Sequence, residues 1–225
     1  MVYLTGDTHG EVERFQKGEL RKPGKQDTVV VLGDFGFVWD GSREEQKHLS
    51  WLFKRPYTLL FIDGTHENYD MLAKYPVEEK FGGKVQHIGG NVYHVCRGSV
   101  IELEGKTYLC FGGAESQDKE EREPSVNWWP QEMPSDEEYA YCEQSLEQHG
   151  WQVDYVLTHD APSKFLDDIL LKMTYEKWFF GCYHKDTQLS TKSRCLFCDV
   201  VRIGEKKRFW QFGKKNTKSD KDIDK

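Results

Sequence analysis

The sequence predicts an α/β fold, because short apolar strands alternate with amphipathic segments over its first third. The 225 residues are enough for a domain with a sizeable core, and aromatic residues at 14% compensate for a hydrophobic content of only 37%. A third observation is that acids and histidines flanked by glycine stand where these strands run out. Ligands bind beyond the carboxyl ends of strands in open α/β sheets, so these residues can converge on one site.

Three strands and three helices are expected in the first 75 residues. The strands are Val2–Thr5, Thr28–Leu32 and Thr58–Ile62, and the helices are residues 11–20, 42–55 and 67–75. Ser42, with Glu45 three residues later, has the pattern of a capping box at the start of the second helix. Pro56 and Pro76 follow the ends of the second and third helices. This alternation is typical of parallel βαβ units.

The pattern changes after residue 90. Turn residues separate short strands at 91–96, Ser99–Leu103 and 107–111, which predicts an antiparallel meander. Ser135, with Glu138 as its capping-box partner, predicts a helix that continues to about His149. The remaining expected elements are strands at 153–157 and 178–180, and two closing strands between residues 188 and 203.

A long segment between Gly112 and Ser135 has no clear periodicity, and such segments are often functional. It leaves a strand end, so it could cover the edge that carries the acids and histidines. The other interpretation is a solvated loop whose residues Trp128 and Trp129 pack into the core. Arg122 could clamp a substrate phosphate with two hydrogen bonds, or form a surface ion pair with neighbouring glutamates.

Charge is unevenly distributed along the chain, whose net charge is −7. Residues 205–225 hold eight Lys/Arg and four Asp/Glu, a surplus of +4, so the remainder carries −11. We expect a single domain over residues 1–210 and a charged, flexible tail over 211–225. The acidic body disfavours binding of long nucleic acids, which depends on neutralising phosphates.

Cytoplasmic localisation is expected, because the sequence contains neither a signal peptide nor an apolar stretch of the ~18 residues that a membrane span needs. The six cysteines are expected to be free thiols in a reducing compartment. Cys195 and Cys198 lack a second Cys/His pair at zinc-finger spacing, so we expect both to be buried structural thiols.

Five short motifs carry the candidate ligands of a divalent ion. Carboxylates and imidazoles suit Mn²⁺, Fe²⁺ or Zn²⁺. Each motif alone is a weak signal, and the prediction depends on their order and on their placement at strand ends. The motifs are Asp7-x-His9, Gly33-Asp34, Gly64-Thr65-His66-Glu67, His159 and Gly181-Cys182-x-His184. The other four histidines (His48, His87, His94 and His149) lack such settings and are expected to be surface or structural residues.

In this order the motifs resemble the calcineurin-like metallophosphoesterase family, over nearly all of the first ~200 residues. The resemblance implies a four-layer αββα sandwich, in which helices flank two mixed sheets. It also implies two divalent metal ions (Mn, Fe or Zn) at one end of the sheets. In that mechanism a metal-bound hydroxide attacks the phosphorus of a phosphate ester in line, and both ions stabilise the developing charge.

Carried over to this sequence, the resemblance implies a first metal held by Asp7, His9, Asp34 and His184. His66 would contact the phosphate and assist the leaving oxygen, and Glu67 would orient His66. The second metal would be held by Asp34 and His159 together with two residues that depart from the family pattern. Thr65 stands where the family has asparagine, and Cys182 stands where it has histidine.

Both departures weaken or alter the second metal site. A hydroxyl is a weaker ligand than an amide oxygen, and a thiolate binds Zn²⁺ or Fe²⁺ well but Mg²⁺ or Mn²⁺ poorly. The expected function is therefore a metal-dependent phosphoesterase that acts on a small-molecule or phosphoprotein substrate. The alternative is a catalytically impaired metal-binding protein of the same fold that binds a phosphorylated ligand or partner.

Overall fold

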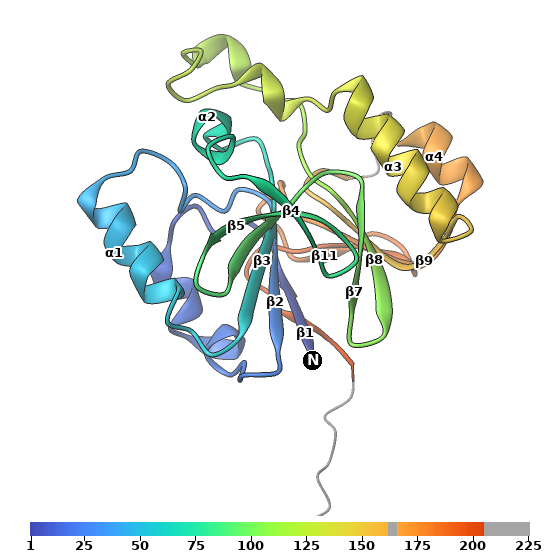
Figure 1. Cartoon of the computed structure of the whole chain (residues 1–225), viewed down its shortest axis with the longest axis horizontal. Coiled ribbons are helices and arrows are strands. Elements are labelled where there is room, and N and C mark those ends of the chain that lie inside the picture. The colour runs from blue at the N-terminus through green and yellow to red at the C-terminus, as the bar shows by residue number, and fades with distance from the viewer. Residues whose placement is uncertain (162–165, 205–225) are drawn as a thin grey trace, which may run out of the picture.

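The protein is a sandwich of two mixed β-sheets, each covered by helices on its outer face, in a computed structural model that describes residues 1–161 and 166–204 (Figure 1). The seven-stranded sheet has the order β13-β1-β2-β3-β6-β5-β4, and the six-stranded sheet has the order β11-β12-β10-β9-β8-β7. The predicted α/β class and the four-layer arrangement are confirmed. The tail predicted for residues 211–225 and the end of the predicted domain lie outside the described residues.

The first sheet contains the three parallel strands that the sequence predicts, with the predicted bounds. β1 pairs with β2 from Val2↔Thr28, and β2 pairs with β3 from Thr28↔Thr58. Four further strands complete the sheet. The sequence predicted strands at the positions of β6 and β13, but not β4 and β5. The strands are β1 (Val2–Thr5), β2 (Thr28–Leu32), β3 (Thr58–Ile62), β4 (Val77–Lys80), β5 (Gly83–Gly89), β6 (Val92–Val95) and β13 (Val201–Ile203).

The predicted antiparallel meander is confirmed for its second and third strands and wrong for its first, because the chain changes sheets after β6. β6 lies parallel to β3 in the first sheet, whereas the hairpin of β7 and β8 belongs to the second. Gly98 enables this crossing: it has φ +79°, and a Cβ at this position would lie 2.8 Å from the backbone nitrogen of Cys142. The second sheet contains β7 (Ser99–Leu103), β8 (Lys106–Phe111), β9 (Gln152–Thr158), β10 (Thr174–Phe180), β11 (Thr187–Gln188) and β12 (Ser193–Cys195).

Three apolar layers hold the sandwich together. In β2, Val30 and Leu32 belong to the core between the two sheets, while Val29 and Val31 belong to the core beneath α1 (Arg43–Leu52). The third layer lies between the second sheet and helices α3 (Asp136–Gln148) and α4 (Asp167–Lys172). Successive side chains of a strand point to opposite faces, so each central strand contributes to two layers and is buried on both faces.

The helices agree with the sequence in part. α3 has the predicted capping box between Ser135 and Glu138. At α1 the Ser42 side chain accepts from the backbone N–H of Glu45, but the Glu45 carboxylate accepts from three loop N–H groups instead of completing the box.

The helix expected at 11–20 is two 3₁₀ turns, η1 (Val12–Phe15) and η2 (Gly18–Arg21), because Gly18 has φ +53°. The helix expected at 67–75 shortens to α2 (Tyr69–Leu72), capped by Asn68.

All six cysteines lie within the described residues and are free thiols. Cys195 is buried as predicted, but Cys198 is exposed, so that prediction is wrong. The reason is that β12 ends at Cys195, and the next residues form a turn in which the Cys198 N–H donates to the Asp186 carboxylate. In the part of the chain that the structure describes, no helix has the length and apolarity to span a membrane.

Arg97 links the first sheet to the long segment and to α3. Its guanidinium, 2% exposed, pairs with the buried Asp63 carboxylate at the end of β3. It also donates to the backbone oxygens of Gln131 and Glu132 and pairs with Glu138. Burial alone would raise the pKa of Asp63, but Arg97 and His94 outweigh this effect and hold that pKa well below its usual range.

Replacing Arg97 with methionine should lower the free energy of unfolding by about 3–5 kcal/mol, because it leaves the buried Asp63 charge without its main partner. Urea denaturation measures the change. Lys172→Met is the matched control, because its pair with Glu143 is 55% and 45% exposed and should contribute less than about 1 kcal/mol. Equal losses in the two variants would contradict this account.

Because folding lowers the pKa of Asp63, the contribution of its carboxylate to the stability of the unmodified chain is present above about pH 4 and lost below it.

Candidate metal centre

The predicted ligands meet at one end of the sandwich, although they lie up to 177 residues apart in the sequence. Asp7, Asp34 and His66 follow β1, β2 and β3 of the first sheet. His159 and His184 follow β9 and β10 of the second sheet. All five strands are parallel to a neighbour in their own sheet, so their carboxyl ends share an edge.

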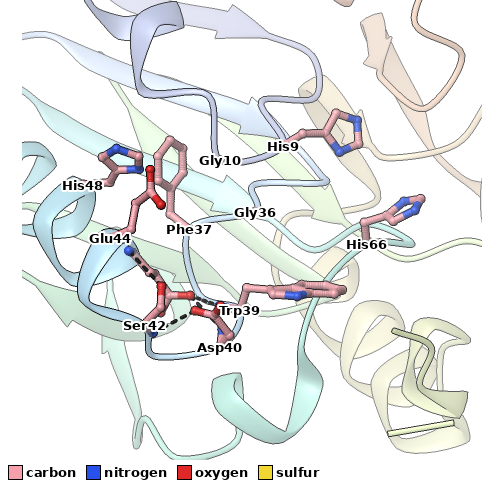
Figure 2. A pocket seen from close by; sticks show the side chains of 11 residues that line it. His9, Gly10, Gly36, Phe37, Trp39, Asp40, Ser42, Glu44, His48 and His66 are labelled. Atoms are coloured by element: carbon pink, nitrogen blue, oxygen red, sulfur yellow. Dashed lines mark hydrogen bonds between the residues drawn. The ribbon is translucent and has the colours of Figure 1, made fainter. Parts of the chain in front are cut away.

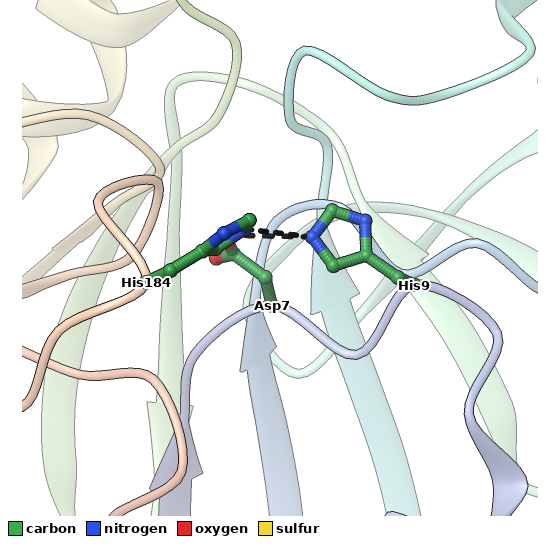
Figure 3. A group of neighbouring side chains, drawn as sticks. All are labelled: Asp7, His9 and His184. Carbon is green, nitrogen blue, oxygen red and sulfur yellow. Dashed lines mark hydrogen bonds and ion pairs between the residues drawn. The ribbon is translucent and has the colours of Figure 1, made fainter.

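Asp7, His9 and His184 form the first compact group of possible ligands (Figure 3). The Nε2 atoms of His9 and His184 lie 2.9 Å apart, and the Asp7 Oδ2 lies 3.1 Å from the His184 Nε2. Apart from this contact with His184, the buried Oδ2 has no polar partner closer than 3.9 Å among the contacts of the described residues. The three donor atoms therefore converge on one point.

The second compact group consists of His9, Asp34 and His66. The Asp34 carboxylate accepts a hydrogen bond from the backbone N–H of His66 at 2.7 Å and lies 3.1 Å from the His66 Nδ1. The other neighbours of Asp34 are the Nε2 atoms of His159, at 3.4 Å, and of His9, at 3.9 Å. Asp34 thus contacts members of both predicted metal sites, as expected of a bridging carboxylate.

His159 and Cys182 lie near these groups but belong to neither of them in the described part of the chain. The His159 Nδ1 donates to the carbonyl oxygen of Leu32 at 2.9 Å, and the fully buried Nε2 lies 3.4 Å from the Asp34 Oδ1. Cys182 donates its backbone N–H to the Asp7 Oδ1 at 3.0 Å. The Thr65 hydroxyl lies 3.4 Å from the His66 Nδ1. The second predicted set is therefore assembled less compactly than the first.

Four of the predicted ligands have a left-handed backbone conformation, which costs free energy for residues other than glycine. They are His9 (φ +45°), Asp34 (φ +46°), Cys182 (φ +67°) and His184 (φ +48°). Such conformations persist where surrounding contacts enforce them, and they cluster at functional sites.

Neighbouring glycines allow the two buried carboxylates to approach the backbone. A Cβ at Gly64 would lie 2.1 Å from the Asp34 Oδ1, and one at Gly181 would lie 2.3 Å from the Asp7 Oδ1. The sequence motifs contain both glycines, but their spacing alone did not indicate which carboxylate each of them accommodates.

The two carboxylates differ in their electrostatic surroundings. Burial is the largest influence on Asp7 and raises its pKa. Burial also opposes ionisation of Asp34, but His159 and the hydrogen bonds from His66 outweigh it and hold the Asp34 pKa well below its usual range. Burial lowers the pKa of His9, which favours the neutral imidazole that a metal ion requires.

In the described structure the Glu67 carboxylate makes no hydrogen bond to the His66 imidazole, although the resemblance implies that Glu67 orients His66. Its buried carboxylate accepts a hydrogen bond from the backbone N–H of Phe35 at 2.8 Å, and its second oxygen has no hydrogen-bond partner among the described residues. Burial, followed by repulsion from Asp34, raises the pKa of Glu67 well above its usual value. Glu67 therefore positions the loop that carries Asp34.

The segment between Gly112 and Ser135 reaches the site through Arg122, as the first interpretation expected. Its Trp129 side chain is 3% exposed and packs into the interior, as the second interpretation expected. Arg122 donates to the Thr65 carbonyl oxygen at 3.1 Å, and its Nη2 lies 2.8 Å from the His66 Nε2. A guanidinium can only donate, so the His66 Nε2 accepts and the proton is on Nδ1, facing Asp34. The same Nη2 pairs with Asp118 at 2.7 Å.

A family model described as calcineurin-like phosphoesterase matches residues 1–187. The chain belongs to this family. The resemblance in the sequence motifs is thereby confirmed, and no curated protein matches the chain. Calcineurin-like phosphoesterases are generally hydrolases that bind divalent metal ions.

The side chains of this calcineurin-like phosphoesterase fit a divalent metal ion. The Asp7 Oδ2 and the His159 Nε2 are buried polar atoms without hydrogen-bond partners among the described residues. Buried polar atoms are normally paired, and a metal ion at this strand edge would give both of them a partner. Mixed carboxylate and imidazole donors suit Mn²⁺, Fe²⁺ or Zn²⁺.

Replacing Gly64 with alanine should displace Asp34 and lower both stability and metal affinity. The added Cβ would lie 2.1 Å from the Asp34 Oδ1 and 2.4 Å from its backbone nitrogen, so we expect a loss of about 1–3 kcal/mol in urea denaturation. Calorimetry with Mn²⁺ and Zn²⁺ measures affinity. Gly24→Ala is the matched control, because its Cβ would meet no atom closer than 3.8 Å. If the two variants bind metal equally well, the contact does not position Asp34.

Proposed function

We propose that this calcineurin-like phosphoesterase hydrolyses a phosphate ester with divalent metal ions held at the carboxyl ends of its strands. The observation that carries the proposal is that the ligand atoms of Asp7, His9 and His184 converge on one point. The His184 Nε2 lies 2.9 Å from the His9 Nε2 and 3.1 Å from the Asp7 Oδ2. Asp34 completes this first set of ligands. A bound ion supplies Lewis-acid stabilisation of the charge that develops on the phosphoryl oxygens.

His66 and Arg122 would bind the phosphate beside the ligands. The side chain of Arg122 is only 9% exposed and its guanidinium is anchored on the Thr65 carbonyl, so it presents its donors with little loss of entropy. An arriving phosphate would accept charge-assisted hydrogen bonds from Arg122 in place of the contact between Arg122 and the His66 Nε2, and that nitrogen would accept a hydrogen bond from a protonated phosphate oxygen. The proton that Asp34 holds on the His66 Nδ1 orients the imidazole throughout.

The second ion would be held by Asp34 and His159, with Cys182 and Thr65 as altered ligands. The position of the buried His159 Nε2, 3.4 Å from the Asp34 Oδ1, supports this assignment. A thiolate at Cys182 would make the site prefer Zn²⁺ or Fe²⁺ over Mn²⁺.

The second candidate function is binding of a phosphorylated ligand or partner without turnover. The departures at Thr65 and Cys182 favour it, because both fall on the same metal site. Small-molecule esters or phosphoproteins remain the proposed substrates, and the acidic body disfavours long nucleic acids. The six free thiols are compatible with a reducing compartment such as the cytoplasm.

Metal analysis of the purified protein, combined with hydrolysis of p-nitrophenyl mono- and diesters, tests the proposal. We expect bound divalent metal and turnover that is higher with Zn²⁺ or Fe²⁺ than with Mg²⁺. Asp7→Asn should lower turnover by at least about a hundredfold, since it removes a charged ligand. Metal binding without turnover of any ester would favour the binding protein instead.

Replacing both departures with the family residues, Thr65→Asn together with Cys182→His, should raise turnover with Mn²⁺ and increase the Mn²⁺ content of the protein. The amide oxygen and the imidazole are better ligands for this ion than the hydroxyl and the thiol. Histidine tolerates the left-handed backbone at residue 182, where φ is +67°. An unchanged rate together with an unchanged metal content would show that residues 65 and 182 do not hold the second ion.

Replacing Arg122 with alanine should raise KM for phosphate esters by about tenfold or more, because a charged hydrogen bond contributes about 1.5–3 kcal/mol. Steady-state kinetics with p-nitrophenyl phosphate measure the effect. The exposed Arg43→Ala on α1 provides the control. If the two variants have the same KM, Arg122 does not bind the substrate.

A further inference from the structure

A groove of about 430 Å³ begins at His9 and His66 and extends toward α1 (Figure 2). Figure 2 shows Glu44 and His48, both from α1, at the end opposite His66. Sites for small organic ligands usually measure about 300–1,000 Å³. Since a water takes about 30 Å³, the groove has room for a group of about ten non-hydrogen atoms beyond the proposed phosphate position.

Trp39 provides a rigid aromatic wall of this groove. Its backbone N–H donates to the Glu45 carboxylate at 2.7 Å, and its carbonyl accepts from the Asn68 side chain at 2.5 Å. The indole ring lies 5.5 Å from that of Trp129 at 84°, and Trp129 is anchored by a hydrogen bond to Asp70. In Figure 2 the half-buried Trp39 side chain extends toward the His66 side of the groove. A planar ring can therefore stack there without a large loss of protein entropy.

The charged side chains in the lining, apart from histidines, are all acidic, and no Lys or Arg lines the groove in the described residues. Glu45 is fully occupied by loop N–H groups, and Asp40 accepts from the backbone of Ser42. Glu44 is exposed and has no hydrogen bond or ion pair within the described residues. Its carboxylate is thus available to a ligand, and it repels a second anionic group.

We propose that this groove binds the alcohol part of the ester and selects a planar aromatic group that carries a positive charge and no negative charge. The ring stacks on Trp39 while the phosphate lies at His66, and the cationic end faces Glu44. This inference rests on the proposed phosphoesterase function, since that function places the phosphate. Aryl phosphates with an ammonium group fit these requirements, whereas polyphosphates and acidic esters do not.

Three matched esters test the selection. Tyramine phosphate has the ring and the ammonium group, its propionate analogue has the same ring with a carboxylate, and ethanolamine phosphate has the ammonium without the ring. We expect kcat/KM for tyramine phosphate to exceed that of each of the others by about fivefold or more.

Two substitutions assign the effect to the groove. Trp39→Ala should raise KM for both aryl esters about fivefold and leave ethanolamine phosphate unchanged, and Trp39→Phe should restore most of the loss. Glu44→Gln should reduce the preference for ammonium over carboxylate by about threefold, with the exposed Glu147→Gln on α3 as the charge-matched control. Thermal unfolding checks that each variant retains its fold.

Calorimetry with the non-hydrolysable phosphonate of the tyramine compound separates the two proposals. If the phosphonate binds in a Trp39-dependent and Glu44-dependent manner but no ester is hydrolysed, the groove is supported and the phosphoesterase proposal fails. If the esters are hydrolysed at equal kcat/KM and the Trp39 and Glu44 variants change nothing, the groove assignment is overturned while the phosphoesterase proposal stands.

Discussion

The buried residue Asp34 connects the loops that form the site. Its backbone oxygen accepts from the N–H groups of Thr8 and His9 at 3.1 and 2.8 Å, so the loop after β2 fixes the loop after β1. Its side chain accepts from the N–H of His66 at 2.7 Å, which fixes the loop after β3. The carboxylate stays charged in a buried position because imidazoles surround it. Loss of that compensation would weaken the contact through which the carboxylate fixes the loop after β3.

The strands of the first sheet could be predicted because a β-branched run such as Thr28–Leu32 ends abruptly in glycine. In contrast, the sequence could not predict which sheet contains β6, since all four residues of Val92–Val95 are buried and would suit either sheet. The crossing after β6 depends on Arg97, whose partner Asp63 lies 34 residues earlier. The loss of the first helix follows from Gly18, which the apolar periodicity of that segment concealed.

The positions of the candidate ligands were predictable because chemistry and strand ends coincide in short motifs. The hydrogen-bond partner of Glu67 was not predictable. Its position next to His66 suggested a contact between the two side chains, but the Glu67 carboxylate accepts from the backbone N–H of Phe35 instead. The approach of Arg122 to His66 joins residues 56 positions apart, and no local pattern encodes it. The groove beside Trp39 was missed for the same reason: it depends on how the loop before α1 packs against Trp129.

The side chains proposed to bind phosphate and those proposed to bind metal are held in place by different contacts, so they would depend on the ion to different degrees. Arg122 is held by Asp118 and by the Thr65 carbonyl, neither of which belongs to the compact acid and histidine groups, so its position does not require a metal. Asp7 and His159, in contrast, bury polar atoms that have no hydrogen-bond partner among the described residues. The proposed binding of a phosphate ester can therefore persist when a metal site is weakened, whereas the proposed hydrolysis cannot. If Thr65 and Cys182 belong to the second metal site as proposed, their departure from asparagine and histidine affects turnover and the choice of metal rather than recognition of the phosphate.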